Sequence, residues 1–264
     1  MQKTVPISLH HEVHGSGPGI VLAHGFAGSA RNFRAQVRSL AKDHRVLTYD
    51  ARGHARSAAP SSPGEYSMQR LVSDMETLLD RAEMSEPVVV AGLSMGAATA
   101  LEFALAHPQR VRCLILASYP PGREDPASIS FRAEAFAQAI DDHGLELAGE
   151  RFIWGPESGL PASMVAQVRA GFLEHTAHGL SGVLRGVLAK LQDPAPLAEE
   201  LARTGLPTLL LHGERDGPSV QASHCLAGEN PMVEARVIPD AGHVVNLDQS
   251  RLFNEALQTF LRRR

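Results

Sequence analysis

Ser94 is the residue in this sequence whose surroundings best suit nucleophilic chemistry. It lies in residues 92–96 (GLSMG), after the apolar run 87–90 and before the helix-forming run 97–106. The pattern G-x-S-x-G between a strand and a helix is typical of a nucleophile elbow, a tight turn that exposes a serine hydroxyl. The N-terminus of the helix favours a developing negative charge. We therefore predict that Ser94 attacks a carbonyl carbon.

A serine nucleophile needs a general base and an acid that orients this base. His243 follows the strand-like run 233–239, and Asp216 follows the strand-like run 206–212. In open parallel sheets, ligands bind beyond the carboxyl ends of the strands. We predict that His243 takes the proton from Ser94, and that Asp216 accepts a hydrogen bond from the other ring nitrogen of His243.

Other acids lie near these positions. Asp216 with the following Gly217 is also suitable for a turn, and Glu214 and Asp240 are alternative partners for the base. Asp248 precedes the last predicted helix, where an acidic residue is expected to act as a cap.

Two backbone N–H groups would complete the site as an oxyanion hole. One comes from the residue after the serine and one from the loop after an early strand. Met95 is predicted to supply the first, and Phe26 the second. Gly25 allows the backbone turn that points the Phe26 N–H at the serine. His24 is expected to hold this loop by a hydrogen bond.

The elements that must position these residues alternate between strands and helices, which indicates a parallel sheet. The strand-like runs are residues 19–24, 45–50, 87–92, 111–117, 206–212 and 233–239, with short strands also expected within 4–14. A closing helix is predicted over residues 249–261.

The alternation breaks between residues 119 and 203. Three helical segments are predicted there, at 130–147, 161–176 and 180–191. A helical block between two strands of one sheet is expected to form a lid over the edge of the sheet. We therefore divide the chain into an α/β core, residues 1–118 and 204–264, and a helical cap, residues 119–203. Trp154 and Phe136 in this cap are predicted to line an apolar pocket, the alternative being that they form the interior of the cap.

Composition excludes several classes of function. Of 264 residues, 44% are hydrophobic and 20% are charged, which is ordinary for a globular enzyme. A formal net charge of −4 provides no basic field for nucleic acid, so no nucleic-acid partner is expected. His10, His11 and His14 lie at mixed spacings on an extended segment, so we expect surface residues and no metal site.

The sequence gives fewer constraints on the localisation and oligomeric state of the protein than on its function. Two cysteines make no disulfide framework, and neither a signal-peptide pattern nor a membrane-spanning apolar run is found. We expect a cytoplasmic protein, a monomer or homodimer, with no membrane partner.

Taken together, the motifs resemble those of the α/β-hydrolase superfamily over essentially the whole chain. The matching segments are 24–29 (HGFAGS), 50–57 (DARGHARS), 92–96 (GLSMG), 212–216 (HGERD) and 242–243 (GH). The resemblance implies a mostly parallel eight-stranded sheet flanked by helices, with a helical lid inserted after strand six. It also implies that residues 50–57 form a structural turn. No cofactor is implied, because a serine triad needs neither metal nor nucleotide.

Three functions are compatible with this resemblance. The first is hydrolysis of a small carboxylic ester or lactone through an acyl-Ser94 intermediate, as in esterases and enol-lactonases, and this is our prediction. The second is a carbon–carbon bond hydrolase or a lyase of the menaquinone-pathway type acting on an anionic substrate. Its candidate cations are Arg132, Arg151, Arg169 and Arg185. The third is a non-catalytic ligand-binding α/β-hydrolase.

Overall fold

A mostly parallel sheet forms the centre of the molecule. The computed structural model describes residues 7–122, 125, 128–156, 160 and 162–264. The strands are β1 (His11–His14), β2 (Gly19–Ala23), β3 (Arg45–Tyr49), β4 (Val88–Leu93), β5 (Val111–Ala117), β6 (Thr208–Gly213) and β7 (Val233–Ile238). Their order is β1-β3-β2-β4-β5-β6-β7, and only the edge strand β1 is antiparallel to its neighbour.

The number of strands differs from the prediction. The described part of the chain contributes seven strands to the sheet, whereas eight were expected. The short strands expected within residues 4–14 are represented by β1 alone, and residues 4–6 lie outside the described residues.

The central strands are buried on both faces, which explains their continuous apolar sequences. Every residue of β4 and β6 is buried. Successive side chains of β6 face opposite layers: Leu210 packs into one hydrophobic cluster, and Leu209 and Leu211 pack into the other.

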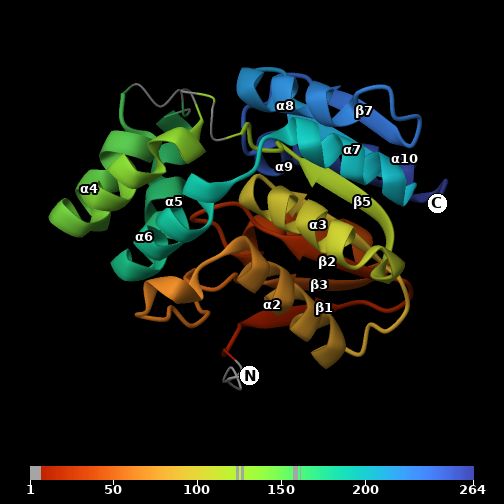
Figure 1. Ribbon diagram of the computed structural model, residues 1–264, viewed down its shortest axis with the longest axis horizontal. Coiled ribbons are helices and arrows are strands. Elements are labelled where there is room, and N and C mark those ends of the chain that lie inside the picture. Colours follow the sequence, from red (N-terminus) through yellow and green to blue (C-terminus); the bar gives the residue numbers. More distant parts are fainter. Residues whose placement is uncertain (1–6, 123–124, 126–127, 157–159, 161) are drawn as a thin grey trace.

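Helices cover both faces of the sheet (Figure 1). The helices of the core are α1 (Arg34–Leu40), α2 (Met68–Arg81), α3 (Met95–Ala106), α7 (Pro194–Thr204), α8 (Gly217–Ala227), α9 (Val245–Asp248) and α10 (Ser250–Leu261). Residues of α1 and α10 pack in one cluster with Leu209 and Leu211, whereas α2, α3, α7 and α8 pack on the opposite face.

A block of helices follows β5 and lies together at one end of the sheet (Figure 1). It comprises α4 (Ile129–Gly149), the π-helical turn η4 (Glu150–Trp154), α5 (Ala162–Phe172), α6 (Ala177–Gly186) and the 3-10 turn η5 (Leu188–Lys190). The block follows the fifth described strand rather than the sixth. Helix α4 is broken at Gly144, where φ is 78°.

The last helix before β6 leaves this block. Helix α7 packs against α3 and α8 of the core, although it lies within the segment predicted as a cap. It has the place of a crossover helix between the parallel strands β5 and β6.

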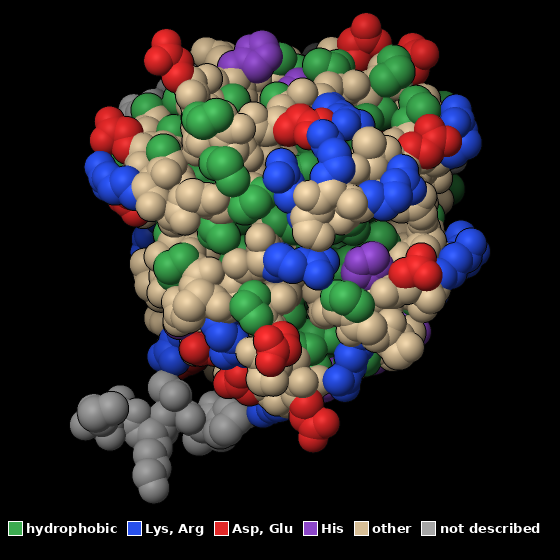
Figure 2. Space-filling model, turned by 90° about the vertical axis from the view of Figure 1, so that its right-hand side faces the viewer, with side chains coloured by type: hydrophobic (Ala, Val, Ile, Leu, Met, Phe, Trp, Pro, Cys, Tyr) green, Lys and Arg blue, Asp and Glu red, His purple; other side chains and the backbone are tan. Residues whose placement is uncertain are grey.

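On the face shown in Figure 2, basic and acidic side chains are interspersed with apolar ones. Among the described residues, no helix has the length and apolar character needed to cross a membrane.

Candidate active site

Ser94 occupies a strained turn between β4 and α3. Its φ of 53° and ψ of −116° are unusual for a residue with a side chain. Its N–H donates to the Ala117 carbonyl at 2.9 Å, and its own carbonyl accepts from the Ala98 N–H at 3.0 Å. These bonds hold the turn, so the hydroxyl stands at the N-terminus of α3.

The two glycines of the motif are required by close backbone packing. A Cβ atom on Gly92 would lie 2.0 Å from the carbonyl oxygen of Gly96. A Cβ atom on Gly96 would lie 2.0 Å from the carbonyl oxygen of Ala23 in β2. Helix α3 therefore begins directly against β2 and β4, and no larger residue fits at either position.

The three side chains predicted to act together form one chain of hydrogen bonds. The Nε2 atom of His243 lies 2.9 Å from Ser94 Oγ, and its Nδ1 atom lies 2.8 Å from Asp216 Oδ2. A carboxylate only accepts, so Nδ1 carries the hydrogen and Nε2 is left to accept from the serine hydroxyl. Asp216 directly precedes α8, and His243 lies in the loop between β7 and α9.

The environment of Asp216 keeps its side chain ionised. Burial opposes the negative charge, but His243 and the hydrogen bonds from Ser219 together outweigh burial and lower the pKa of the carboxyl group. The alternative acids are engaged elsewhere. Glu214 accepts from the backbone N–H of Asp240 at 3.1 Å, and the Asp240 side chain is 82% exposed beside Arg215.

Asp248 holds the loop of His243 and does not cap a helix. Its carboxylate accepts from the N–H of Gly242 at 2.8 Å. Helix α10 begins two residues later, with Gln249 as its N-terminal cap. The prediction of a cap was wrong, because the carboxylate is directed at a neighbouring backbone donor instead.

The loop after β2 forms a turn beside the serine. The N–H of Gly28 donates to the Gly25 carbonyl at 3.0 Å, which leaves Phe26 and Ala27 at the centre of the turn. A Cβ atom on Gly25 would lie 3.3 Å from the Cβ of Ser94, so the turn and the serine are in contact. The N–H of Phe26 is not used by this turn. We call residues 25–28 the oxyanion turn.

His24 fastens the start of the oxyanion turn, as predicted. Its Nδ1 donates to the Gly25 carbonyl at 2.7 Å, and its Nε2 accepts from the N–H of Ala51 at 2.9 Å. Burial lowers the pKa of His24 to about 4. The neutral ring is therefore the form that makes both bonds.

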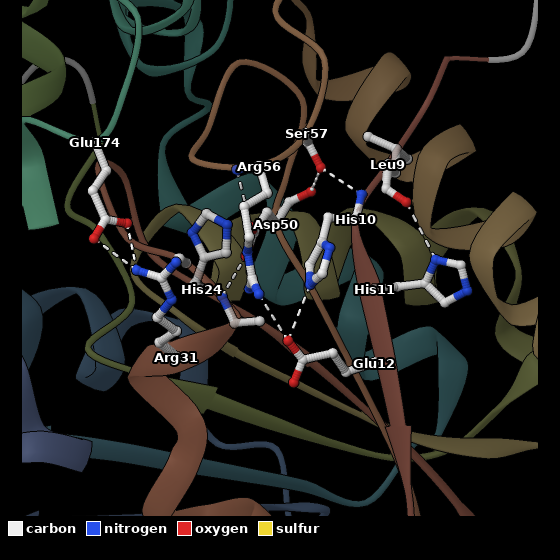
Figure 3. A network of polar contacts seen from close by, with 12 residues as sticks. Leu9, His10, His11, Glu12, His24, Arg31, Asp50, Arg56, Ser57 and Glu174 are labelled. Carbon is white, nitrogen blue, oxygen red and sulfur yellow. Dashed lines mark hydrogen bonds and ion pairs between the residues drawn. The ribbon is translucent and has the colours of Figure 1, made fainter.

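The segment 50–57 binds the chain just after the oxyanion turn through Asp50 (Figure 3). The carboxylate of Asp50 accepts from the N–H of Ala30 at 2.8 Å and from the guanidinium of Arg56 at 2.8 Å. The Ser57 hydroxyl donates to the Asp50 carbonyl and accepts from the N–H of His10. This segment is a structural turn, which agrees with the resemblance.

The aromatic residues of the helical block pack against one another. The Phe136 ring is fully buried and stacks on Phe152 with centroids 4.5 Å apart. Its edge contact with Phe26 joins the block to the oxyanion turn, with centroids 5.9 Å apart. Trp154 is 9% exposed and packs against Gly149 and Phe172. A role of Phe136 and Trp154 in lining a pocket stays a prediction.

Three of the four arginines considered for an anionic substrate are bound by other groups. Arg169 pairs with Glu146 at 2.6 Å. Arg185 pairs with Glu134 and with Asp141. The guanidinium of Arg151 lies over the ring of Phe152, 5.2 Å from its centroid.

Two buried histidines near the site were not found from the sequence. His54 is fully buried, and its ring lies 5.0 Å from that of His24 and 5.3 Å from that of His175. His175 lies between α5 and α6, and both of its ring nitrogens face backbone carbonyls. His54 lies in the motif segment 50–57, which could have pointed to it. Nothing in the sequence around His175 distinguishes that residue.

Proteins with similar sequences are named for different reactions. The chain is 28% identical to a putative 2-succinyl-6-hydroxy-2,4-cyclohexadiene-1-carboxylate synthase of Bacillus subtilis, over 98% of the chain and 97% of that protein. It is also 28% identical to a putative carbamate hydrolase RutD of Pseudomonas savastanoi, over 96% of the chain and 97% of that protein.

Among solved structures, a thermophilic esterase from Thermogutta terrifontis superposes with a TM-score of 0.85 and is 26% identical in sequence. The match covers 99% of this chain and 96% of the esterase. Residues 20–256 match the model of the alpha/beta hydrolase family. With the elbow at Ser94 and the mostly parallel sheet around it, this match shows that the chain belongs to the alpha/beta hydrolase family.

Proposed function

We propose that the protein is a serine hydrolase that cleaves a small carboxylic ester or lactone, with Ser94, His243 and Asp216 as its catalytic triad. The observation that carries this proposal is the position of His243, whose two ring nitrogens reach Ser94 Oγ and Asp216 Oδ2 at 2.9 and 2.8 Å. This arrangement activates a serine without a metal or a cofactor.

Acylation begins when Ser94 Oγ attacks the carbonyl carbon of the ester and His243 Nε2 takes the hydroxyl proton. The backbone N–H groups of Phe26 and Met95 bind the oxyanion of the tetrahedral intermediate, each contributing about 3 kcal/mol. Asp216 holds the ring and stabilises the imidazolium. His243 then gives its proton to the leaving oxygen, the ester C–O bond breaks, and the alcohol leaves.

Deacylation repeats these steps with water. His243 takes a proton from the water as its oxygen attacks the acyl carbon, and the same N–H groups bind the second oxyanion. When the bond to Ser94 Oγ breaks, His243 returns a proton to this oxygen, and the carboxylic acid is released. For a lactone, the alcohol and the acid remain parts of one product.

A neutral substrate fits the charges of helix α3 and of the helical block. The first turn of α3 carries the uncharged residues 95–98 (MGAA), so it offers no cation. Arg169 and Arg185 are already neutralised by carboxylates. These observations favour an uncharged ester over a dicarboxylate.

The full-length similarity to the Bacillus subtilis synthase supports a second candidate, a lyase or carbon–carbon hydrolase acting on an anionic substrate. Saturable turnover of a dicarboxylate substrate, together with no turnover of neutral esters, would establish this function in place of the first.

The test of the main proposal is a screen of chromogenic short-chain esters and lactones, with Ser94→Ala as the blank. The wild-type protein is expected to hydrolyse at least one of them, and the variant is expected to lose this activity. A fluorophosphonate should add to Ser94, as read by mass spectrometry of the peptide. Labelling of Ser94 without any hydrolysis would indicate a ligand-binding protein, and equal turnover by the variant would rule out the mechanism.

A further inference from the structure

His175 joins the helical block to the oxyanion turn through a backbone carbonyl. It lies in the loop between α5 and α6 and is 7% exposed. Its Nε2 lies 3.1 Å from the carbonyl oxygen of Gly28, and its Nδ1 lies 3.0 Å from the carbonyl oxygen of Phe172. Gly28 is 147 residues away in the sequence, so the first contact joins two distant elements, whereas the second stays within the helical block.

The carbonyl that His175 reaches belongs to the last residue of the oxyanion turn. The N–H of Gly28 closes this turn on Gly25, and the residues between them are Phe26 and Ala27. Ala27 has a φ of 55°, a conformation that residues with a Cβ atom rarely adopt. A turn with this strain keeps its shape only where its surroundings hold it. His24 holds the first carbonyl of the turn, and His175 holds the last.

We propose that His175 is a positioning residue for the oxyanion hole: its Nε2–H donates to the Gly28 carbonyl and fixes the direction of the Phe26 N–H. The inference rests on the proposed hydrolysis. A carbonyl oxygen only accepts, so this bond requires a hydrogen on Nε2. Turnover then depends on a side chain of the helical block that acts through the backbone of the oxyanion turn.

A second contact between the same loops serves as a control. Glu174 pairs with Arg31 across the same junction, and both side chains are about two-fifths exposed, at 43% and 38%. Exposed ion pairs contribute little to stability. Glu174→Gln therefore removes a contact of the helical block without changing the oxyanion turn, and its kcat is expected to stay within about twofold of wild type.

Two substitutions of His175 test the roles of its two ring nitrogens separately. The amide nitrogen of Gln occupies a position close to that of Nε2, and the amide nitrogen of Asn a position close to that of Nδ1. His175→Gln keeps a donor for Gly28, whereas His175→Asn keeps only the donor for Phe172. We expect His175→Asn to lower kcat about 10- to 100-fold with KM changed little, because small displacements of a catalytic group have effects of this size. His175→Gln should retain kcat within about threefold.

The affinity for a trifluoromethyl ketone, compared with that for a product acid, distinguishes a positioning role of His175 from a purely structural one. Its adduct with Ser94 places an oxyanion in the hole, whereas a product carboxylic acid binds without forming this adduct. In His175→Asn the affinity for the ketone should fall by the same factor as kcat, and the affinity for the product acid should stay unchanged. An equal fall for both ligands would overturn the proposal.

The wild-type protein provides a test that does not depend on the folding of a variant. Nitrogen-15 spectra of the histidine side chains, with His175→Gln used for assignment, should show Nε2 of His175 bearing a hydrogen. An Nε2 without hydrogen would overturn the proposal. Failure of the wild type to hydrolyse any ester would refute the proposed function instead, whereas wild-type hydrolysis with full kcat in His175→Asn would refute the role of His175 alone.

Discussion

At the scale of single residues, the orientation of His243 depends on one carboxylate. Asp216 accepts the Nδ1 hydrogen and thereby leaves Nε2 free to take the proton of Ser94. An amide in this place also offers a donor to Nδ1, which favours the ring form with its hydrogen on Nε2. That form has no acceptor for the serine hydroxyl.

Asp216→Asn is therefore expected to lower kcat for ester hydrolysis by a factor of about 10⁴, with the protein still folded. Steady-state kinetics alongside circular dichroism would measure both properties. The matched control is Asp240→Asn, because this exposed residue is one of the alternative acids. A larger loss of activity in the control than in Asp216→Asn would show that the acid was assigned wrongly.

Residues that follow strands were easier to predict than residues that bind backbone groups. Ser94, Asp216 and His243 each lie just beyond a strand, and parallel strands end at a common edge, so the topology alone brings them near one another. Asp248 and His175 bind an N–H and a carbonyl whose positions are set by tertiary packing. Their sequence neighbourhoods carry no signal of those partners.

At the scale of elements, the junction of β2, β4 and α3 is the most tightly constrained part of the fold. The space at this junction admits no side chain at Gly96, because any Cβ atom there would overlap the carbonyl of Ala23. Strands were predicted well because buried parallel strands need unbroken apolar runs: the run 87–92 corresponds to β4, Val88–Leu93, in which every residue is buried. Helix α7 was not predicted, since its first turn contains Pro194 and Pro196, which a helix tolerates only at this end.

Gly96→Ala is expected to destabilise the protein by about 3 kcal/mol or more, because backbone atoms must move to admit the methyl group. Gly171→Ala in α5 is the matched control. Nothing lies within 4 Å of its added Cβ, so the helix should gain about 0.5–1 kcal/mol. Urea unfolding of the two variants would measure both changes. A Gly96→Ala protein as stable as wild type would contradict the close approach of α3 to β2.

At the scale of the whole molecule, buried histidines make the stability depend on pH. His24 and His54 are shielded from solvent where the helical block meets the core, and burial lowers the pKa of both rings. For His24 the value falls from 6.5 to about 4. Between these pH values the unfolded chain binds a proton at His24 and the folded chain does not, so folding is disfavoured as the pH falls.

The free energy of unfolding should therefore be highest above pH about 6.5 and should decrease toward pH 4, with His24 contributing about 3 kcal/mol of the decrease. Urea unfolding at pH 7.5 and 4.5 would measure it. His24→Asn should reduce the difference between the two pH values, even though the variant is less stable at both. His143→Asn, at an exposed site in α4, should leave the difference as in wild type. A difference in His24→Asn as large as that of wild type would show that the ring is not the source.

The return of α7 to the core has a consequence for how this molecule could be re-engineered. Helix α7 already completes a regular strand–helix–strand unit between β5 and β6. The preceding helices α4 to α6 are therefore an insertion that the sheet does not require. Such an insertion can be replaced by one of different shape while Ser94, His243 and Asp216 keep their positions. A grafted replacement would have to supply its own donor for the Gly28 carbonyl, because the helical block provides one of the supports of the oxyanion turn.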